Sequence, residues 1–182
     1  PHVGILYCRE GLLDQLEPDR LRTQDQTAPY KIETGTLNHA AIVGIKAAIE
    51  YIAALGSGSD LRSKIVTAMK LVGQHERRLA SELYDGLTSI NGITVYGQPF
   101  SSALRAPTIS FTVKSKTAEE VCTRLGERGF CTWDGHFYAL RAIEALGLLE
   151  RGGVTRVGIS MYNTTEEVVN LLAEVKRIAE EN

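Results

Sequence analysis

The stretch Pro107-Thr-Ile-Ser-Phe-Thr-Val113, followed shortly by Thr117-Ala-Glu-Glu120, decides the fold class. Its first part alternates apolar and polar residues, which is the period of a half-buried β-strand. Its second part is a capping box, in which a hydroxyl and a carboxylate satisfy backbone N–H groups at the start of a helix. A strand that leads into a helix ending near Gly129 predicts an α/β fold.

Similar patterns continue on both sides of this stretch. Short strands are predicted at 93–96, 130–133 and 154–160, and a short helix at 138–146. A second capping box, Thr164-Thr-Glu-Glu167, predicts a helix that reaches about Ala179. Residues 93–182 are therefore predicted to form a small α/β domain of two layers, with helices on one face of an antiparallel or mixed sheet.

The amino-terminal half has a different organisation. Its apolar run at 3–7 predicts a buried strand, and residues 17–35 predict an irregular loop of unusual length. Two long helices are expected at 38–55 and 60–89, because apolar residues recur there at helical spacing. A strand this short must pair within the small domain, with another subunit or with missing sequence, so residues 1–92 look like an incomplete domain.

Composition excludes several classes of protein. The chain has 182 residues, 43% of them hydrophobic, and a formal net charge of −2, so size scaling predicts that about 70% of its surface is buried on folding. Neither a basic block for nucleic acid nor an apolar run long enough for a membrane span is visible, and no signal peptide is apparent.

The three cysteines give the remaining compositional expectations. They are too few and too scattered for a disulfide scaffold or a zinc site, which favours a reducing cytoplasm and predicts no metal. Cys131 and Cys122 are expected to be buried and unreactive, because both lie in apolar surroundings.

The string Ile32-Glu-Thr-Gly-Thr-Leu-Asn-His39 immediately precedes a predicted helix. Gly35 permits close approach of the backbone, and Thr36 with the N–H groups of the helix start can bind an anion such as phosphate. The alternative is an ordinary N-cap made by Thr36 or Asn38.

Arg156 interrupts an otherwise apolar strand in Val154-Thr-Arg-Val-Gly-Ile-Ser160. An arginine at such a position is costly without a partner, and its guanidinium fork matches a carboxylate or a phosphate. The alternative is an arginine on an edge strand whose charged end extends to solvent.

The string Trp133-Asp-Gly-His-Phe-Tyr138 brings the only tryptophan close to a histidine and a tyrosine. His136 can serve as a general acid or base, or as a stacking surface for a planar cofactor. The alternative is an Asp-Gly turn flanked by packed aromatic side chains.

Taken together, these strings resemble the carboxyl-terminal half of the class V aminotransferase superfamily, and within it cysteine desulfurase-like proteins. Pro1-His-Val-Gly-Ile-Leu-Tyr7 resembles the segment after the family's cofactor-binding lysine. Glu33-Thr-Gly-Thr-Leu-Asn-His39 resembles its Glu-x-Gly-Thr-x-Asn motif, and Arg156 with Tyr162-Asn-Thr164 resembles its Arg…Tyr-Asn-Thr ending. The order and spacing of the three motifs support the likeness over nearly the whole chain.

The resemblance implies a pyridoxal phosphate enzyme, a homodimeric transferase or lyase, that acts on a small amino acid. Gly35 and Thr36 would contact the cofactor phosphate of the neighbouring subunit. Arg156 would hold the substrate α-carboxylate, and His136 and Tyr138 would line the substrate pocket. The implied fold is the carboxyl-terminal small domain of a pyridoxal phosphate-dependent transferase, together with helices and a strand from the large domain.

Two departures from the family pattern shape the functional expectation. The cofactor-binding lysine would precede Pro1, so we expect a carboxyl-terminal fragment that has no catalytic residue, binds no pyridoxal phosphate and is inactive alone.

Tyr138 occupies the position of the desulfurase cysteine, and Cys131 lies seven residues earlier. Desulfuration, transamination and epimerisation therefore stay open. The competing hypothesis is a stand-alone, non-catalytic α/β module that binds a partner or a small anion.

Overall fold

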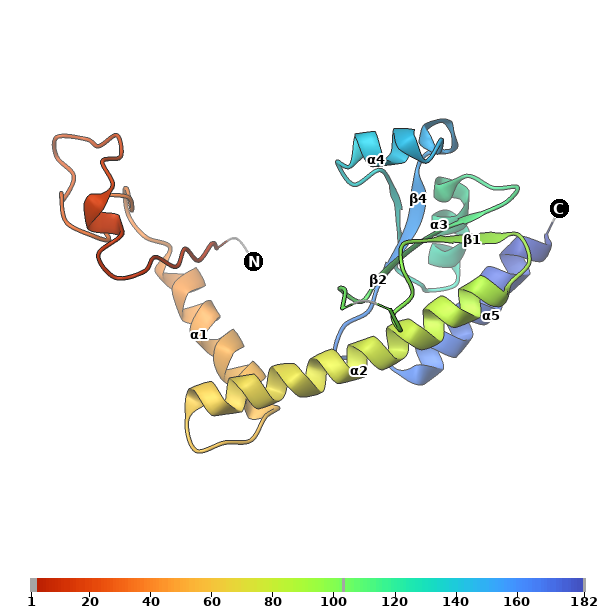
Figure 1. Cartoon of the computed structure of the whole chain (residues 1–182), viewed down its shortest axis with the longest axis horizontal. Helices are drawn as coiled ribbons and strands as arrows, with labels where there is room; N and C mark the ends of the chain where they lie inside the picture. Colours follow the sequence, from red (N-terminus) through yellow and green to blue (C-terminus); the bar gives the residue numbers. More distant parts are fainter. Residues whose placement is uncertain (1–2, 103, 182) are drawn as a thin grey trace. The chain divides into compact units, whose positions relative to one another are not determined.

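A computed structural model describes residues 3–102 and 104–181. The chain consists of two compact units, Pro1–Ala68 and Met69–Asn182, and each is described here by itself (Figure 1). The first unit contains the 3-10 helix η1 (Leu13–Gln15), helix α1 (His39–Ala54) and the start of helix α2 (Leu61–Ser89). The second unit contains the rest of α2, all the strands and the remaining helices.

The amino-terminal segment of the first unit is irregular. Residues 3–9 form neither helix nor strand, so the strand predicted at 3–7 is wrong. Ile5, Leu6 and Tyr7 are 75%, 74% and 86% exposed, because the described part of this unit offers no strand with which they could pair. The long loop is confirmed, and the buried Lys31 anchors it by donating from Nζ to the carbonyl oxygen of Leu16 at 2.9 Å.

Both long helices begin where the sequence predicts. The side chain of Asn38 accepts a hydrogen bond from the N–H of Ala41 at 3.0 Å and caps α1. The carboxylate of Asp60 accepts one from the N–H of Ser63 at 2.8 Å at the start of α2. Asn38 rather than Thr36 is therefore the N-cap of α1, and such a cap contributes about 1 kcal/mol.

The sheet of the second unit has the order β1-β2-β4-β3, and every neighbouring pair is antiparallel. Its strands are β1 (Ile93–Tyr96), β2 (Thr108–Val113), β3 (Trp133–Gly135) and β4 (Val154–Gly158). Three strands coincide with their predicted positions, whereas β3 begins later than expected. Pairing with β4 starts only at Trp133 opposite Arg156, so residues 130–132 run free of the sheet.

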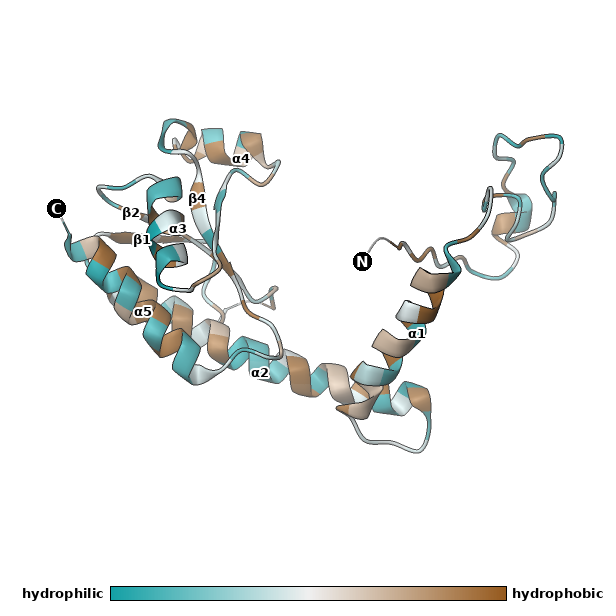
Figure 2. Cartoon of the chain, turned by 180° about the vertical axis from the view of Figure 1, so that it is seen from behind, coloured by the Kyte–Doolittle hydropathy of each residue, from teal (hydrophilic) through white to brown (hydrophobic). Residues whose placement is uncertain are grey.

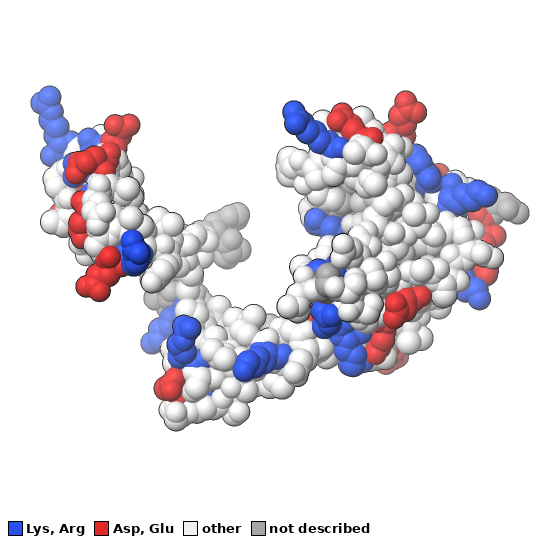
Figure 3. Space-filling model, viewed as in Figure 1, with Lys and Arg blue, Asp and Glu red and all other residues white. Residues whose placement is uncertain are grey.

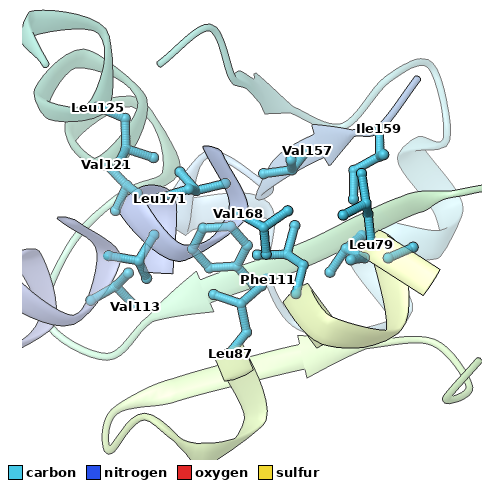
Figure 4. Close-up of a cluster of buried hydrophobic side chains, with 14 of the residues drawn as sticks. Leu79, Leu87, Phe111, Val113, Val121, Leu125, Val157, Ile159, Val168 and Leu171 are labelled. Carbon is cyan, nitrogen blue, oxygen red and sulfur yellow. The ribbon is translucent and has the colours of Figure 1, made fainter. Parts of the chain in front are cut away.

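Three helices cover one face of this sheet, which confirms the predicted two-layer α/β arrangement. They are α2, α3 (Ala118–Glu127) and α5 (Thr165–Glu180). Phe111 of β2 lies within the cluster that they bury, with 0% of its surface exposed (Figure 4). The helical partners in this core are Leu79, Leu83, Leu87, Val121, Leu125, Val168, Leu171, Val175 and Ile178.

Both predicted capping boxes are present. Thr117 and Glu120 bond reciprocally at the start of α3, and Thr164 and Glu167 do so at the start of α5. Each box satisfies two N–H groups that the helix itself leaves without partners. These caps fix where each covering helix begins relative to the strand before it.

A smaller apolar cluster surrounds Val154. Ile143 of α4 (Leu140–Ala145) and Leu148, just before the 3-10 helix η2 (Leu149–Arg151), are buried against it. Tyr96 and Phe137 pack on this cluster while remaining partly exposed. The cluster therefore connects α4 with the strand that carries Arg156.

The division between the compact units falls within α2, at Ala68 and Met69. The carboxyl-terminal turns of this helix belong to the second unit because Leu79, Leu83 and Leu87 are buried in its core. The boundary expected between residues 92 and 93 refers to domains of a longer protein and stays a prediction.

Acidic and basic side chains are interspersed over the visible surface of the second unit (Figure 3). Among the described residues, no helix combines the length and hydropathy that crossing a membrane requires. The same residues contain no group of three or more His, Cys, Asp or Glu side chains that could hold a metal ion.

Candidate active site

The sheet register explains how an arginine is accommodated in strand β4. Arg156 lies opposite Ser110 of β2 and opposite Trp133 of β3, whereas its neighbours Thr155 and Val157 are buried. Because side chains alternate along a strand, Arg156 emerges on the face away from the main core. Strand β4 pairs with β2 on one side and β3 on the other, so the alternative of an arginine on an edge strand is wrong. The structure gives Arg156 an aromatic partner instead.

That partner is Phe137. The guanidinium carbon of Arg156 lies 3.9 Å from the centroid of the Phe137 ring, which is a cation–π contact. The same ring packs on the small cluster around Val154. Phe137 therefore links the arginine to the packing of α4.

The turn that presents Phe137 has an unusual backbone. Gly135 has φ 120°, and Phe137 and Tyr138 have φ 51° and 61°. The left-handed region is rare for large side chains and costs on the order of 1–3 kcal/mol per residue, so the surroundings must enforce it. A close approach of Gly153 to the carbonyl oxygen of Gly135, which leaves no room for a Cβ, helps to fix this turn.

His136 takes part in the same turn. Its Nδ1 accepts a hydrogen bond from the N–H of Tyr138 at 3.2 Å, and the two rings meet edge to face with centroids 6.4 Å apart. An acceptor at Nδ1 requires the neutral ring to carry its hydrogen on Nε2. His136 can therefore offer a donor at Nε2 from an exposed position.

These side chains line one hollow of about 460 Å³. The structure thus brings together the three predicted substrate residues, Arg156, His136 and Tyr138. Sequence reasoning did not assign a site role to Phe137 or Trp133, which also line it. Their presence in the same short aromatic string was the available signal, but nothing in the sequence shows that Phe137 turns back onto β4.

Gly35 and Thr36 belong to the first unit, whereas the Arg156 hollow belongs to the second. Both are exposed just before α1, and a Cβ built on Gly35, which has φ 75°, meets no atom within 4 Å. Because Asn38 caps α1, the Thr36 hydroxyl takes no part in the cap. An open glycine turn with a hydroxyl before a helix amino terminus fits a phosphate group.

Asn163 of the Tyr-Asn-Thr motif has two structural partners. The side chain of Asn163 accepts a hydrogen bond from the N–H of Ser160 at 2.8 Å. The backbone carbonyl oxygen of Asn163 lies 2.9 Å from Nε2 of His75 in α2. The motif therefore closes the turn between β4 and α5, while Tyr162 is 77% exposed.

The cysteines differ from one another in environment. Cys131 is exposed, so the expectation that it is buried is wrong, and it lines a second hollow of about 480 Å³ with Gly158 and Tyr162. It is exposed because residues 130–132 do not pair with β4. Cys122 is half-buried, and burial raises its pKa, although Thr132 donates a hydrogen bond to its sulfur at 3.2 Å.

The fold and the site define an α/β protein with an arginine-centred hollow at the edge of its sheet, and comparison with known proteins identifies the family. The family model described as "Aminotransferase class-V" matches residues 2–171. The chain therefore belongs to the class V aminotransferase family.

Similar curated proteins are cysteine desulfurases. The chain is 31% identical over 189 residues to a probable cysteine desulfurase of Methanothermobacter thermautotrophicus, covering 97% of this chain and 44% of that protein. It is 30% identical to the cysteine desulfurase of Salmonella agona, with 97% and 42% covered. The chain spans less than half the length of these relatives.

Solved structures agree on the fold. The apo structure of a cysteine desulfurase from Thermococcus onnurineus matches with a TM-score of 0.75 at 22% identity, covering 96% of this chain and 42% of that one. The Escherichia coli cysteine desulfurase CsdA matches with a TM-score of 0.64 at 26% identity, covering 85% and 34%.

Proposed function

We propose that this chain is the carboxyl-terminal part of a pyridoxal phosphate-dependent enzyme that acts on a small amino acid. The observation that carries the proposal is the guanidinium of Arg156, stacked on Phe137 and open to a hollow of about 460 Å³. Membership of the class V aminotransferase family and the incomplete coverage of its relatives support it.

Arg156 would bind the α-carboxylate of the substrate. Its fork donates hydrogen bonds to two carboxylate oxygens in one plane, which orients the amino acid as well as binding it. His136 would donate from Nε2, and the fully exposed Tyr138 would line the pocket or hold a proton at its hydroxyl. Orientation of the substrate by remote contacts is a large contribution to catalysis of this kind.

Gly35 and Thr36 would hold the cofactor phosphate, and the residues present fit that role. The phosphate would accept a hydrogen bond from the Thr36 hydroxyl. It would also lie near the amino terminus of the sixteen-residue α1, where the helix dipole favours negative charge. When bound, pyridoxal phosphate supplies an electron sink for bond cleavage at the substrate Cα. In a homodimer, these residues would serve the site of the neighbouring subunit.

The proposal assigns the cofactor-binding lysine to a part of the longer protein outside these 182 residues. The isolated chain is accordingly proposed to be inactive and free of pyridoxal phosphate. A cytoplasmic location is proposed as well, on the basis of three cysteines that the structure describes as free.

The reaction is proposed at the level of the substrate class. The two curated relatives are named as cysteine desulfurases. In this chain, Tyr138 stands at the position that the family pattern gives to the desulfurase cysteine. Sulfide release from L-cysteine by the longer enzyme would establish desulfuration, and its absence with turnover of L-alanine would establish another branch.

Trp133 provides the test on the chain itself. It is the only tryptophan, it is 68% exposed, and it lines the same hollow as Arg156. We expect L-alanine and L-cysteine to change its fluorescence saturably, and Arg156→Gln to abolish the change. Arg156→Lys should bind more weakly than wild type, because an ammonium group replaces the fork with a point charge.

Arg141→Gln is the matched control. Arg141 is exposed on α4 and does not line the hollow, so the same loss of charge there should leave the titration unchanged. An Arg156→Gln variant that responds like wild type would contradict the proposal and favour the non-catalytic module.

A further inference from the structure

We infer that Phe137 is a positioning residue for Arg156 and that the lining of the Arg156 hollow favours amino acids with one carboxylate over those with two. This inference rests on the proposed function of Arg156. It names a residue and a substrate class that the family assignment leaves open.

The first step is the geometry of the stack. With 3.9 Å between the guanidinium carbon and the ring centroid, the Phe137 ring covers one face of the Arg156 guanidinium. The in-plane N–H groups are the ones that pair with a carboxylate, and a stack leaves them available. Phe137 therefore fixes the plane of the guanidinium, and with it the plane in which a carboxylate is bound. This lowers the entropic cost of binding.

The second step is the rigidity of the ring. Phe137 packs against the cluster formed by Ile143, Leu148 and Val154, and its backbone is left-handed with φ 51°. Such a backbone persists only where surrounding contacts enforce it. The Phe137 ring is therefore held in one orientation, and the Arg156 guanidinium packs against it.

The third step is the charge of the lining. The hollow is lined by seven described residues, and Arg156 alone among them carries a permanent positive charge. A second carboxylate on the substrate would find no cationic partner there and would lose hydration without compensation. The lining thus favours L-alanine or L-cysteine over L-aspartate.

The experiment is a fluorescence titration of Trp133 in the full 182-residue chain with L-alanine and L-aspartate. Phe137→Leu keeps an apolar side chain on the small cluster but removes the π face. We expect it to weaken L-alanine binding about three- to tenfold, the range of one cation–π contact. It should leave the preference for L-alanine over L-aspartate unchanged, because Phe137→Leu adds no positive charge to the lining. Phe137→Tyr, which restores the ring, should bind like wild type.

The outcomes separate this inference from the proposed function. If Phe137→Leu keeps the wild-type affinity while Arg156→Gln loses binding, the role of Phe137 is refuted and that of Arg156 stands. If the wild-type chain binds L-aspartate as tightly as L-alanine, the preference for one carboxylate is refuted. If neither variant changes the response, or if the wild-type chain shows no saturable response, both are refuted. Circular dichroism of each variant establishes that it is folded.

A second measurement needs no variant. The ring current of Phe137 should shift the side-chain NMR resonances of Arg156 upfield in the wild-type chain, and addition of L-alanine should move its Nε–H resonance. Arg156 resonances at ordinary positions would overturn the stack, even if Phe137→Leu failed to fold.

Discussion

At the scale of single residues, two adjacent glycines separate backbone strain from steric exclusion. Gly152 and Gly153 have φ 74° and 86°. A Cβ on Gly153 would lie 2.2 Å from the carbonyl oxygen of Gly135, whereas one on Gly152 meets nothing within 4 Å. The close approach at Gly153 supports the turn that carries Phe137.

Alanine substitutions at the two positions should therefore differ. Gly152→Ala is expected to lower the free energy of unfolding by about 1 kcal/mol, the cost of a left-handed alanine. Gly153→Ala adds a backbone clash and should cost roughly 2 kcal/mol more, with a shift in Trp133 emission because the turn moves. Urea unfolding followed by circular dichroism measures both values, and equal effects would contradict the close approach.

At the scale of helices and strands, the sequence predicts best where local chemistry determines the structure. The capping boxes at Thr117 and Thr164 and the alternation at 107–113 yield elements that the structure confirms. The prediction of a strand at 3–7 is wrong, because an apolar run becomes a stable strand only when a neighbouring strand pairs with it. The left-handed turn at Phe137 could not be predicted, since aromatic residues rarely adopt it.

The second capping box makes part of the stability depend on pH. The N–H of Thr164, and then the side chain of Asn163, donate to the Glu167 carboxylate and lower its pKa below 4.5. A lowered pKa in the folded state means that the stabilisation is complete above 4.5 and is lost as pH falls through the folded value. Near neutral pH, Glu167→Gln should be less stable than wild type, and the difference should shrink on acidification.

Glu166→Gln is the control for this titration, because Glu166 lies in the same helical turn outside the capping box. Glu166→Gln removes the same charge without removing the capping bonds, so near neutral pH it should destabilise the protein less than Glu167→Gln does. Thermal unfolding as a function of pH measures the three proteins, and a Glu167→Gln difference independent of pH would contradict the assignment.

At the scale of the whole molecule, the two units differ in how much core they contain. Both apolar clusters lie in Met69–Asn182. Among the described residues of Pro1–Ala68, the only buried hydrophobic ones are Ala53 and Ala68. The folding free energy of this chain therefore resides mainly in the second unit.

Hydrogen exchange should reveal this difference. Amides of β2 and β4 should exchange by global unfolding, whereas those of residues 3–54 should exchange by local opening, many times faster. Mass spectrometry of peptides after exchange measures both sets. Equal protection across the two units would contradict the uneven distribution of the core.

Helix α1 illustrates what an uncovered apolar surface implies for the chain in solution. Ile42, Val43 and Tyr51 are 45%, 66% and 60% exposed, and hydrophobic residues occupy much of its visible surface (Figure 2). Only Lys46 and Glu50 interrupt it with acidic or basic side chains after His39. Burial of apolar surface becomes more favourable on warming and in the presence of sulfate. Temperature and salt therefore decide whether molecules of this chain stay monodisperse or aggregate.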